Sequence, residues 1–323
     1  MRRKGVSYAK FGYFFCLPFV FAFVIFSLYP IIYTLMVSIS DYAGTTAKNF
    51  NILWDNPWKS YNYILMESPY FKKTLITTAS LWIMNFIPQM GLSLLLTAWF
   101  TSIHMKIHFQ GFFKVLFYMP NIITAASIAM LFSSLFSYNA GPINSIYSML
   151  GFEKFYFMES AGFAKGLVAF IQCWMWYGNT TIILIAGVMG INPALFEAAS
   201  VDGASGWQTF IHITLPSLRT ILLFTLVTSM VGGLQMFDIP LLLTPTPGGG
   251  PDRATETTSV YIYNQAFTAG RQYNRAAAAS MILFAIAAVF SGLLFFIMRD
   301  RDAIKLEREN RRQRKLSQRG GAL

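Results

Sequence analysis

The chain has 323 residues, of which 55% are hydrophobic and only 12% are charged. A soluble globular domain carries roughly 25% charged residues, so this composition argues against a soluble protein. The net charge is +11, but the basic residues gather at the two ends of the chain, which argues against the continuous basic face of a nucleic-acid-binding protein.

Six apolar runs are long enough to cross a membrane, which takes about 20 helical residues. The first, residues 11–39, is far longer than the apolar core of a signal peptide, so we expect an uncleaved span. The sequence therefore predicts an all-α membrane protein with six transmembrane helices over residues 11–298. After the first span, the other five runs are residues 73–101, 111–136, 163–190, 217–244 and 276–298.

The lysines and arginines predict the orientation of these spans. With both termini inside, the cytoplasmic segments include residues 1–10 and the basic tail 299–323, and together the inner segments hold most of the 25 basic residues. The positive-inside rule favours this topology, and the tail is expected to contact anionic lipid. The outer loops are then residues 40–72, 137–162 and 245–275.

Residues 192–216 are too polar for a span and lie on the predicted cytoplasmic side. Asn192 and Pro193 are typical of the first positions of a helix. Ser205 with Gln208 three residues later forms a capping-box pattern, which predicts the start of a second short helix. The stretch is therefore expected to fold as a two-helix elbow.

A turn signal, Asp202-Gly203, separates the two helices of the elbow. Such an elbow presents a small convex surface to a partner, on which Glu197 supplies a charge and the small residues Ala198 and Ala199 permit close approach. The alternative interpretation is an ordinary loop between spans.

The elbow also fits a longer pattern: E-A-A, three residues, G, nine residues, then I-x-L-P. This pattern resembles the EAA loop of the permease subunits of binding-protein-dependent ABC importers. The run PGGGPDRATETTSVYIYNQAF after the fifth span is similar to the outer loop of their carbohydrate-uptake branch. The expected ATPase-coupling residues are Glu197, Ala198, Ala199, Asp202, Gly203, Ile213, Leu215 and Pro216.

The resemblance implies a transport subunit of a bacterial plasma (inner) membrane rather than an enzyme. It implies four kinds of partner: a second, different permease subunit, two cytoplasmic ATPase subunits, an extracytoplasmic solute-binding protein and a carbohydrate solute. ATP would be bound by the ATPase subunits, and the chain has no G-x-x-x-x-G-K-[ST] pattern of its own. No cofactor or metal is expected, since the pair His104 and His108 has no carboxylate near it in sequence.

Polar residues inside spans are costly, and they usually face the interior of a bundle or a water-filled path. Amides and a carboxylate can bond the hydroxyls of a sugar, while an aromatic ring can cover its C–H surface. The resemblance implies that the spans on either side of the elbow bind the solute. The alternative roles are helix–helix bonding and an interfacial aromatic belt. The candidates are Asn85, Gln89, Trp174, Trp176, Tyr177, Asn179, Gly233, Gln235 and Asp238.

The sequence leaves the solute open among a sugar or oligosaccharide, a polyol and glycerol phosphate. An ion-coupled secondary transporter is the alternative from another class, but it would usually show internal repeats and ionisable residues at the midplane, and no such repeat is visible. An intramembrane enzyme would need paired ionisable residues, whereas Asp238 stands alone in the fifth span.

Overall fold

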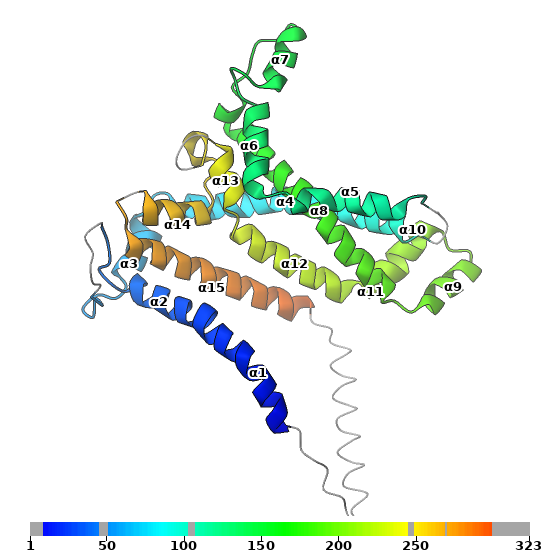
Figure 1. Ribbon diagram of the computed structural model, residues 1–323, viewed down its shortest axis with the longest axis horizontal. Helices are drawn as coiled ribbons and strands as arrows, with labels where there is room; N and C mark the ends of the chain where they lie inside the picture. The colour runs from blue at the N-terminus through cyan, green and yellow to red at the C-terminus, as the bar shows by residue number, and fades with distance from the viewer. Residues whose placement is uncertain (1–8, 45–50, 103–106, 245–248, 269, 299–323) are drawn as a thin grey trace, which may run out of the picture. The chain divides into compact units, whose positions relative to one another are not determined.

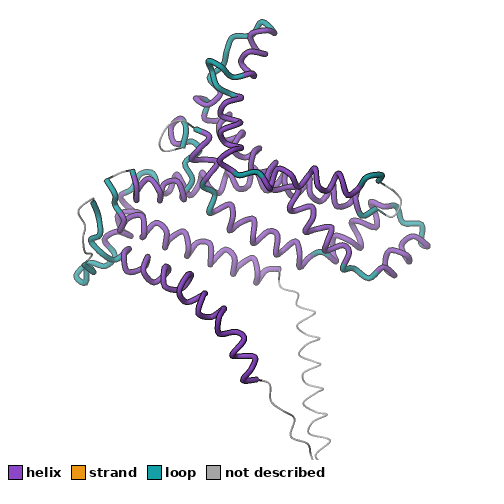
Figure 2. Tube along the Cα trace, in the orientation of Figure 1, coloured by secondary structure: helices purple, strands orange, loops and turns teal. Residues whose placement is uncertain are grey.

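The computed structural model of the chain describes residues 9–44, 51–102, 107–244, 249–268 and 270–298. Over these residues the chain consists of helices joined by loops and turns (Figure 2). Within the same residues, the only bridge of β type is an isolated one between Ser40 and Ile52. The predicted all-α fold is thus confirmed. The basic tail and nearly all of the N-terminal segment 1–10 lie outside the described residues.

The helices follow one another along the chain as labelled in Figure 1. Short π- or 3₁₀-segments join several of them. In chain order they are α1 (Ala9–Phe23), α2 (Tyr29–Ser38), α3 (Lys59–Asn62), α4 (Phe71–Phe100), α5 (Gln110–Ile122), α6 (Ala125–Leu135), α7 (Pro142–Met149), α8 (Ala161–Met189), α9 (Pro193–Val201), α10 (Gly206–Thr209), α11 (Leu215–Ser217), α12 (Arg219–Leu234), α13 (Asp238–Leu243), α14 (Thr258–Phe267) and α15 (Tyr273–Met298).

Five helical stretches of the described chain are long and apolar enough to cross a membrane. Around the first of them, the side chains are almost all exposed, for example Phe15 at 79% and Phe26 at 78%. Exposed aromatic rings on all sides suit a helix in contact with lipid or another subunit. The five stretches are Gly12–Ser38, Phe71–Phe100, Ala161–Met189, Arg219–Leu243 and Tyr273–Ile297.

The expected span at residues 111–136 is not one straight helix. The chain bends by 87° between α5 and α6, so the total is six spans only if this bent pair counts as one. Ile123 and Thr124 adopt extended backbone conformations, and the Thr124 hydroxyl accepts a hydrogen bond from the Ser127 N–H, which caps α6. The bend therefore comes from a helix start inside an unbroken apolar run, a signal that hydropathy does not carry.

The chain divides into two compact units, and α4, α8, α12 and α15 contribute residues to both. The first unit comprises Met1–Met84, Thr124–Ile171 and Gly233–Ile286. In it, α6 packs against α13. One of its apolar clusters consists of Ile64, Phe71, Tyr261, Ala278 and Ala279.

The second unit comprises Asn85–Ile123, Gln172–Gly232 and Ala287–Leu323. Its helices α5 and α8 approach so closely at Gly178 that a Cβ there would overlap the backbone carbonyl oxygen of Phe117. Its apolar clusters are formed by Leu96, Phe100 and Ile185, and by Leu184, Val188 and Leu218.

Gly178→Ala should destabilise the protein, because the new methyl group would force α5 and α8 apart. Overpacking of this kind costs about 1–3 kcal/mol. Gly166→Ala in the same helix is the matched control, since nothing lies within 4 Å of a Cβ at that position. The thermal unfolding midpoint of the detergent-purified protein should fall for Gly178→Ala and hold or rise for Gly166→Ala. Equal midpoints for the two variants would contradict the close approach.

Candidate functional site

The predicted elbow forms two short helices. Helix α9 begins as expected: Asn192 is its N-cap, the Asn192 Oδ1 accepts a hydrogen bond of 3.1 Å from the Ala194 N–H, and Pro193 takes the first helical position. The helix ends before Gly203, which has a φ of +75°. Glycine reaches this left-handed conformation without the steric cost of a Cβ.

The second helix of the elbow starts with the predicted capping box. The Ser205 hydroxyl accepts from the Gln208 N–H at 3.3 Å, and Gln208 Oε1 accepts from the Ser205 N–H at 2.8 Å. Helix α10 then continues through the π-segment Phe210–Thr214 into α11. Only Leu218 separates α11 from α12, so the elbow passes almost directly into a membrane span.

The two faces of the elbow differ. Glu197, Ala198, Asp202, Gly203 and Pro216 are exposed, whereas Ile213 and Leu215 are half-buried. Ala199, which the sequence placed beside Ala198 on the partner-facing surface, is buried at 6% exposure and packs inside the unit.

Two large apolar side chains on the outside of the elbow were not singled out from the sequence. Val201 is 88% exposed and Trp207 is 56% exposed. Exposed apolar residues grouped on one small element are typical of a contact surface for another protein. The apolar residues along α9 and α10 do not reveal Val201 and Trp207, because the same residue types also fill the inner face of the elbow.

The elbow is anchored to the spans of its own unit. Phe196 of α9 packs against the cluster of Leu184, Val188 and Leu218. Gly187 lets α8 approach α12 closely, since a Cβ at Gly187 would overlap the side chain of Ile221 in α12. A displacement of α9 is therefore transmitted through packed side chains to α8 and α12.

Several of the predicted solute residues serve helix packing in the second unit. Gln89 Nε2 donates to the Thr180 hydroxyl at 2.8 Å, and both side chains are buried. Tyr177 packs against the cluster of Leu96, Phe100 and Ile185, and its backbone carbonyl accepts from Ser93. These contacts join α4 to α8.

The other candidates of the second unit differ in their exposure. Trp176 is 46% exposed, which leaves its ring free of the unit's core. Trp174 and Asn179 are half-buried, and Asn85 is buried at 5% exposure.

Three candidates lie in the first unit, where the fifth span breaks. Gly233 lies against the Trp82 side chain, which a Cβ would overlap. Gln235 lies in the break between α12 and α13, Asp238 begins α13, and both side chains are exposed. The exposed polar pair is therefore available to a ligand, while Gly233 serves close packing.

The break frees backbone carbonyls, and the turn over residues 249–259 supplies their hydrogen-bond donors. The Thr257 hydroxyl donates to the Met236 carbonyl at 2.6 Å, and the Ser259 hydroxyl donates to the Leu234 carbonyl at 3.4 Å. Thr258 also bonds α4, where its N–H donates to the Thr78 hydroxyl at 2.9 Å. The T-E-T-T-S run thus completes a broken membrane helix, which needs internal bonding partners for its backbone.

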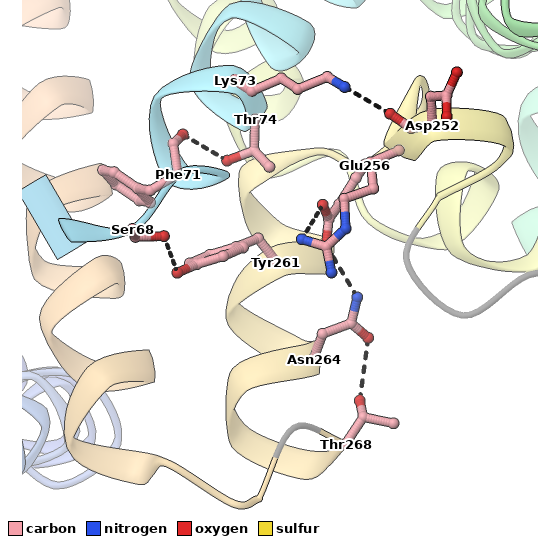
Figure 3. A network of polar contacts seen from close by, with 10 residues as sticks. Ser68, Phe71, Lys73, Thr74, Asp252, Glu256, Tyr261, Asn264 and Thr268 are labelled. Carbon is pink, nitrogen blue, oxygen red and sulfur yellow. Dashed lines mark hydrogen bonds and ion pairs between the residues drawn. The ribbon is translucent and has the colours of Figure 1, made fainter. Parts of the chain in front are cut away.

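A fully buried carboxylate, Glu256, lies in the middle of this run (Figure 3). Its Oε1 accepts from Asn264 Nδ2 at 3.2 Å, while its Oε2 faces Arg253 Nη1 at 3.3 Å without a hydrogen bond. The Arg253 guanidinium also stacks on the ring of Tyr70 at 3.8 Å. Lys73 holds the same turn by donating to the Asp252 carbonyl.

The glycines before this turn let it close. Gly249 and Gly250 both have positive φ values, and a Cβ on Gly249 would overlap the backbone of Glu256. Asp252 and Arg253 also adopt positive φ, at 51° and 57°. Non-glycine residues in this conformation are strained, and such strain persists only where surrounding contacts fix it. The Glu256 network is that set of contacts.

Sequence reasoning did not find Glu256, because one glutamate in a polar loop gives no pattern. The only signal was its place between threonines after a glycine-rich turn.

The described residues contain no cluster of three or more potential metal ligands, and His104 of the pair noted in the sequence lies outside them.

Burial raises the pKa of the Glu256 carboxyl above its ordinary value, although Arg253, the Asn264 amide and Lys73 each lower it. The folded state therefore favours the protonated form. Its contribution to stability is fully present at low pH and is lost as the pH rises through the folded pKa.

Glu256→Gln should remove this pH dependence, because the amide keeps the shape of the protonated acid. As the pH falls from about 8 to about 5, the unfolding midpoint of the wild type should improve relative to that of Glu256→Gln. Glu153→Gln, in the exposed loop, is the matched control for removal of one carboxylate. Parallel curves for the wild type and Glu256→Gln would contradict the assignment.

The sequence matches the profile of a family described as the binding-protein-dependent transport system inner membrane component, over residues 13–301. It is similar to the lactose transport system permease protein LacF of Rhizobium radiobacter, with 29% identity over 90% of this chain and 94% of that protein. It is also similar to the multiple sugar-binding transport system permease protein MsmF of Streptococcus mutans, with 28% identity over 84% of this chain and 89% of that protein.

Among solved structures, a chain of a bacterial ABC transporter involved in the import of the acidic polysaccharide alginate shares the fold. The TM-score is 0.74 at 24% identity, over 89% of this chain and 94% of that one. Because the family profile covers most of the sequence, the chain belongs to the inner-membrane permease components of binding-protein-dependent transport systems, and it is a transport subunit rather than an enzyme.

Proposed function

We propose that the chain forms one half of the translocation pathway of an ATP-binding-cassette importer for a sugar or oligosaccharide. A second, different permease subunit supplies the other half. Two cytoplasmic ATPase subunits drive the cycle, and an extracytoplasmic binding protein delivers the solute. The sugar-transport names of the two curated relatives support a saccharide solute.

The elbow is the observation that carries this proposal. Its two capped helices are joined at Gly203 and anchored by Phe196, and α10 leads through α11 towards α12. The outer surface offers Glu197 and Val201 to an ATPase subunit. Closure of the ATPase pair on ATP would then move the elbow as a lever, so that ATP favours the state to which it binds more tightly.

The proposed orientation follows the positive-inside rule. Both termini lie in the cytoplasm, and residues 40–72, 137–162 and 245–275 face outwards. The rigid turn around Glu256 then lies on the side of the binding protein. Residues 192–216 lie on the side of the ATPases.

The proposed solute path uses the exposed candidates. Trp176 offers an aromatic face, and Gln235 and Asp238 offer an amide and a carboxylate beside the break in the fifth span. Gln89 and Tyr177 support the path by holding α4 against α8.

Energy coupling separates this proposal from an ion-coupled secondary transporter. Proteoliposomes that hold the full complex with its binding protein should accumulate a labelled saccharide only with ATP on the ATPase side. A proton or sodium gradient without ATP should give no uptake. Accumulation driven equally well by an ion gradient would overturn the proposal, and ATP-driven uptake of glycerol phosphate or a polyol instead of a saccharide would correct the solute.

Gly203→Val should uncouple ATP hydrolysis from uptake. Its φ of +75° is costly for a β-branched residue, while no neighbour within 4 Å would clash with a Cβ, so the change acts on the turn alone. We expect uptake to fall by about tenfold or more, the effect of roughly 1.4 kcal/mol, with membrane insertion unchanged. Gly203→Asn is the matched control, because asparagine tolerates this conformation. Normal uptake by Gly203→Val would contradict the lever.

A further inference from the structure

A cavity of about 730 Å³ lies in the first unit, apart from all the solute residues named above. It opens beside the end of α6, between the loop that follows α6, the 3₁₀-segment Phe157–Glu159, Leu242 of α13 and Pro251 of the outer turn. Small-molecule sites have volumes of roughly 300–1,000 Å³, so the cavity has room for a short saccharide.

The polar groups of the cavity are free to bind a ligand. Ser133 and Ser134 lie in the last turn of α6 and Ser137 follows it, while Asn139 and Glu159 add an amide and a carboxylate. Within the described residues, none of these five side chains makes a hydrogen bond to the chain. Hydroxyl groups of a ligand can therefore bond these side chains in place of solvent without leaving a buried group unpaired.

The cavity also has a rigid aromatic wall. Tyr138 and Tyr156 stack almost in parallel, with ring centroids 3.7 Å apart and an angle of 5° between the planes. Both rings line the cavity, and the Tyr156 side chain is 48% exposed. The open face of a tyrosine ring suits the apolar C–H face of a pyranose. The hydroxyl groups around the edge of the pyranose can then reach the serines and the Asn139 amide.

The charge of the cavity selects among saccharides. Its described lining contains one carboxylate, Glu159, and no lysine, arginine or histidine. Lys154 Nζ lies 6.0 Å from the Tyr138 ring centroid but does not line the cavity. A uronic-acid polymer would bring carboxylates next to Glu159 without a cation to balance them, whereas an uncharged sugar meets no such repulsion.

We propose that this cavity is an entry subsite that holds an uncharged saccharide on the outer side before it moves to the path through the spans. The inference rests on the proposed saccharide import and narrows it to neutral glycans. None of the solute residues predicted from the sequence lines this cavity, so the entry subsite is separate from the path through the spans. The residues that define it are Ser133, Ser137, Tyr138, Asn139, Tyr156 and Glu159.

The test uses the full transporter complex in proteoliposomes and in lipid nanodiscs. ATP-driven uptake is first measured with lactose, maltotriose, cellotriose and raffinose, which are neutral, and with trigalacturonate, which is acidic. A sugar that the wild type imports is then used as the probe of direct binding to the nanodisc complex without its binding protein, by saturation-transfer NMR. Omitting the binding protein leaves the permease sites as the only source of signal.

Tyr156→Ala should weaken binding of the neutral probe about three- to tenfold, the loss expected for one ring face. Tyr156→Phe should restore binding, since it keeps the ring. Tyr147→Ala is the matched control, because the Tyr147 ring belongs to the same loop region and packs edge-on against Phe157, with ring centroids 5.6 Å apart, but does not line the cavity. The basal ATPase rate of the Tyr147→Ala control should equal that of the wild type.

Glu159→Lys tests selectivity, which a purely structural role of the loop would not change. Trigalacturonate should compete with the neutral probe about tenfold better in this variant than in the wild type. Unchanged probe binding in Tyr156→Ala, or unchanged competition in Glu159→Lys, would overturn the entry subsite while saccharide import stands. If the wild type imported trigalacturonate and none of the neutral sugars, the restriction to neutral glycans would be wrong. If ATP drove the uptake of none of these saccharides, both the proposed function and the subsite would be wrong.

Discussion

The backbone of a helix that breaks inside a membrane protein must find new hydrogen-bond partners, and the first unit depends on how this chain meets that constraint. Water is not available in hydrocarbon, so each free carbonyl costs several kcal/mol unless the protein bonds it. At the break between α12 and α13, hydroxyls of Thr257 and Ser259 bond the carbonyls of Met236 and Leu234. The turn over residues 249–259 therefore completes the span and is not a separate loop.

This dependence explains the composition of the turn. The donors Thr257 and Ser259 have to lie next to the break, and Thr257 is fully buried there. To bring them there the chain must fold back sharply, which requires the positive φ values of its glycines. The strained conformation of Asp252 and Arg253 is then held by the hydrogen bond from Lys73 to the Asp252 carbonyl and by the ion pair of Arg253 with Glu256. Pro251 of the same turn borders the proposed saccharide cavity, so its shape depends on the same bonds.

Sequence patterns correctly predicted those features of the fold that depend on interactions between neighbouring residues. The caps at Asn192 and Ser205 and the turn at Gly203 involve partners only two or three residues apart, and the structure confirms each of them. The bend at Thr124 is also local, but it lies inside an unbroken apolar run, where hydropathy outweighed a single capping residue. Contacts such as Lys73 with Asp252, separated by 179 positions, leave no local trace in a single sequence.

Solute residues were the hardest to predict, because a polar side chain in a span has two uses that look alike in sequence. Gln89 and Gln235 are both amides beside a helix irregularity, yet Gln89 is buried and bonded to Thr180 while Gln235 is exposed. The difference lies in the neighbouring groups. The hydroxyl of Thr180 on the adjacent helix bonds the Gln89 amide, whereas Gln235 lies in the break between α12 and α13, where its side chain is exposed. Exposure within a described unit therefore ranks Trp176, Gln235 and Asp238 above the buried candidates as contacts of a solute.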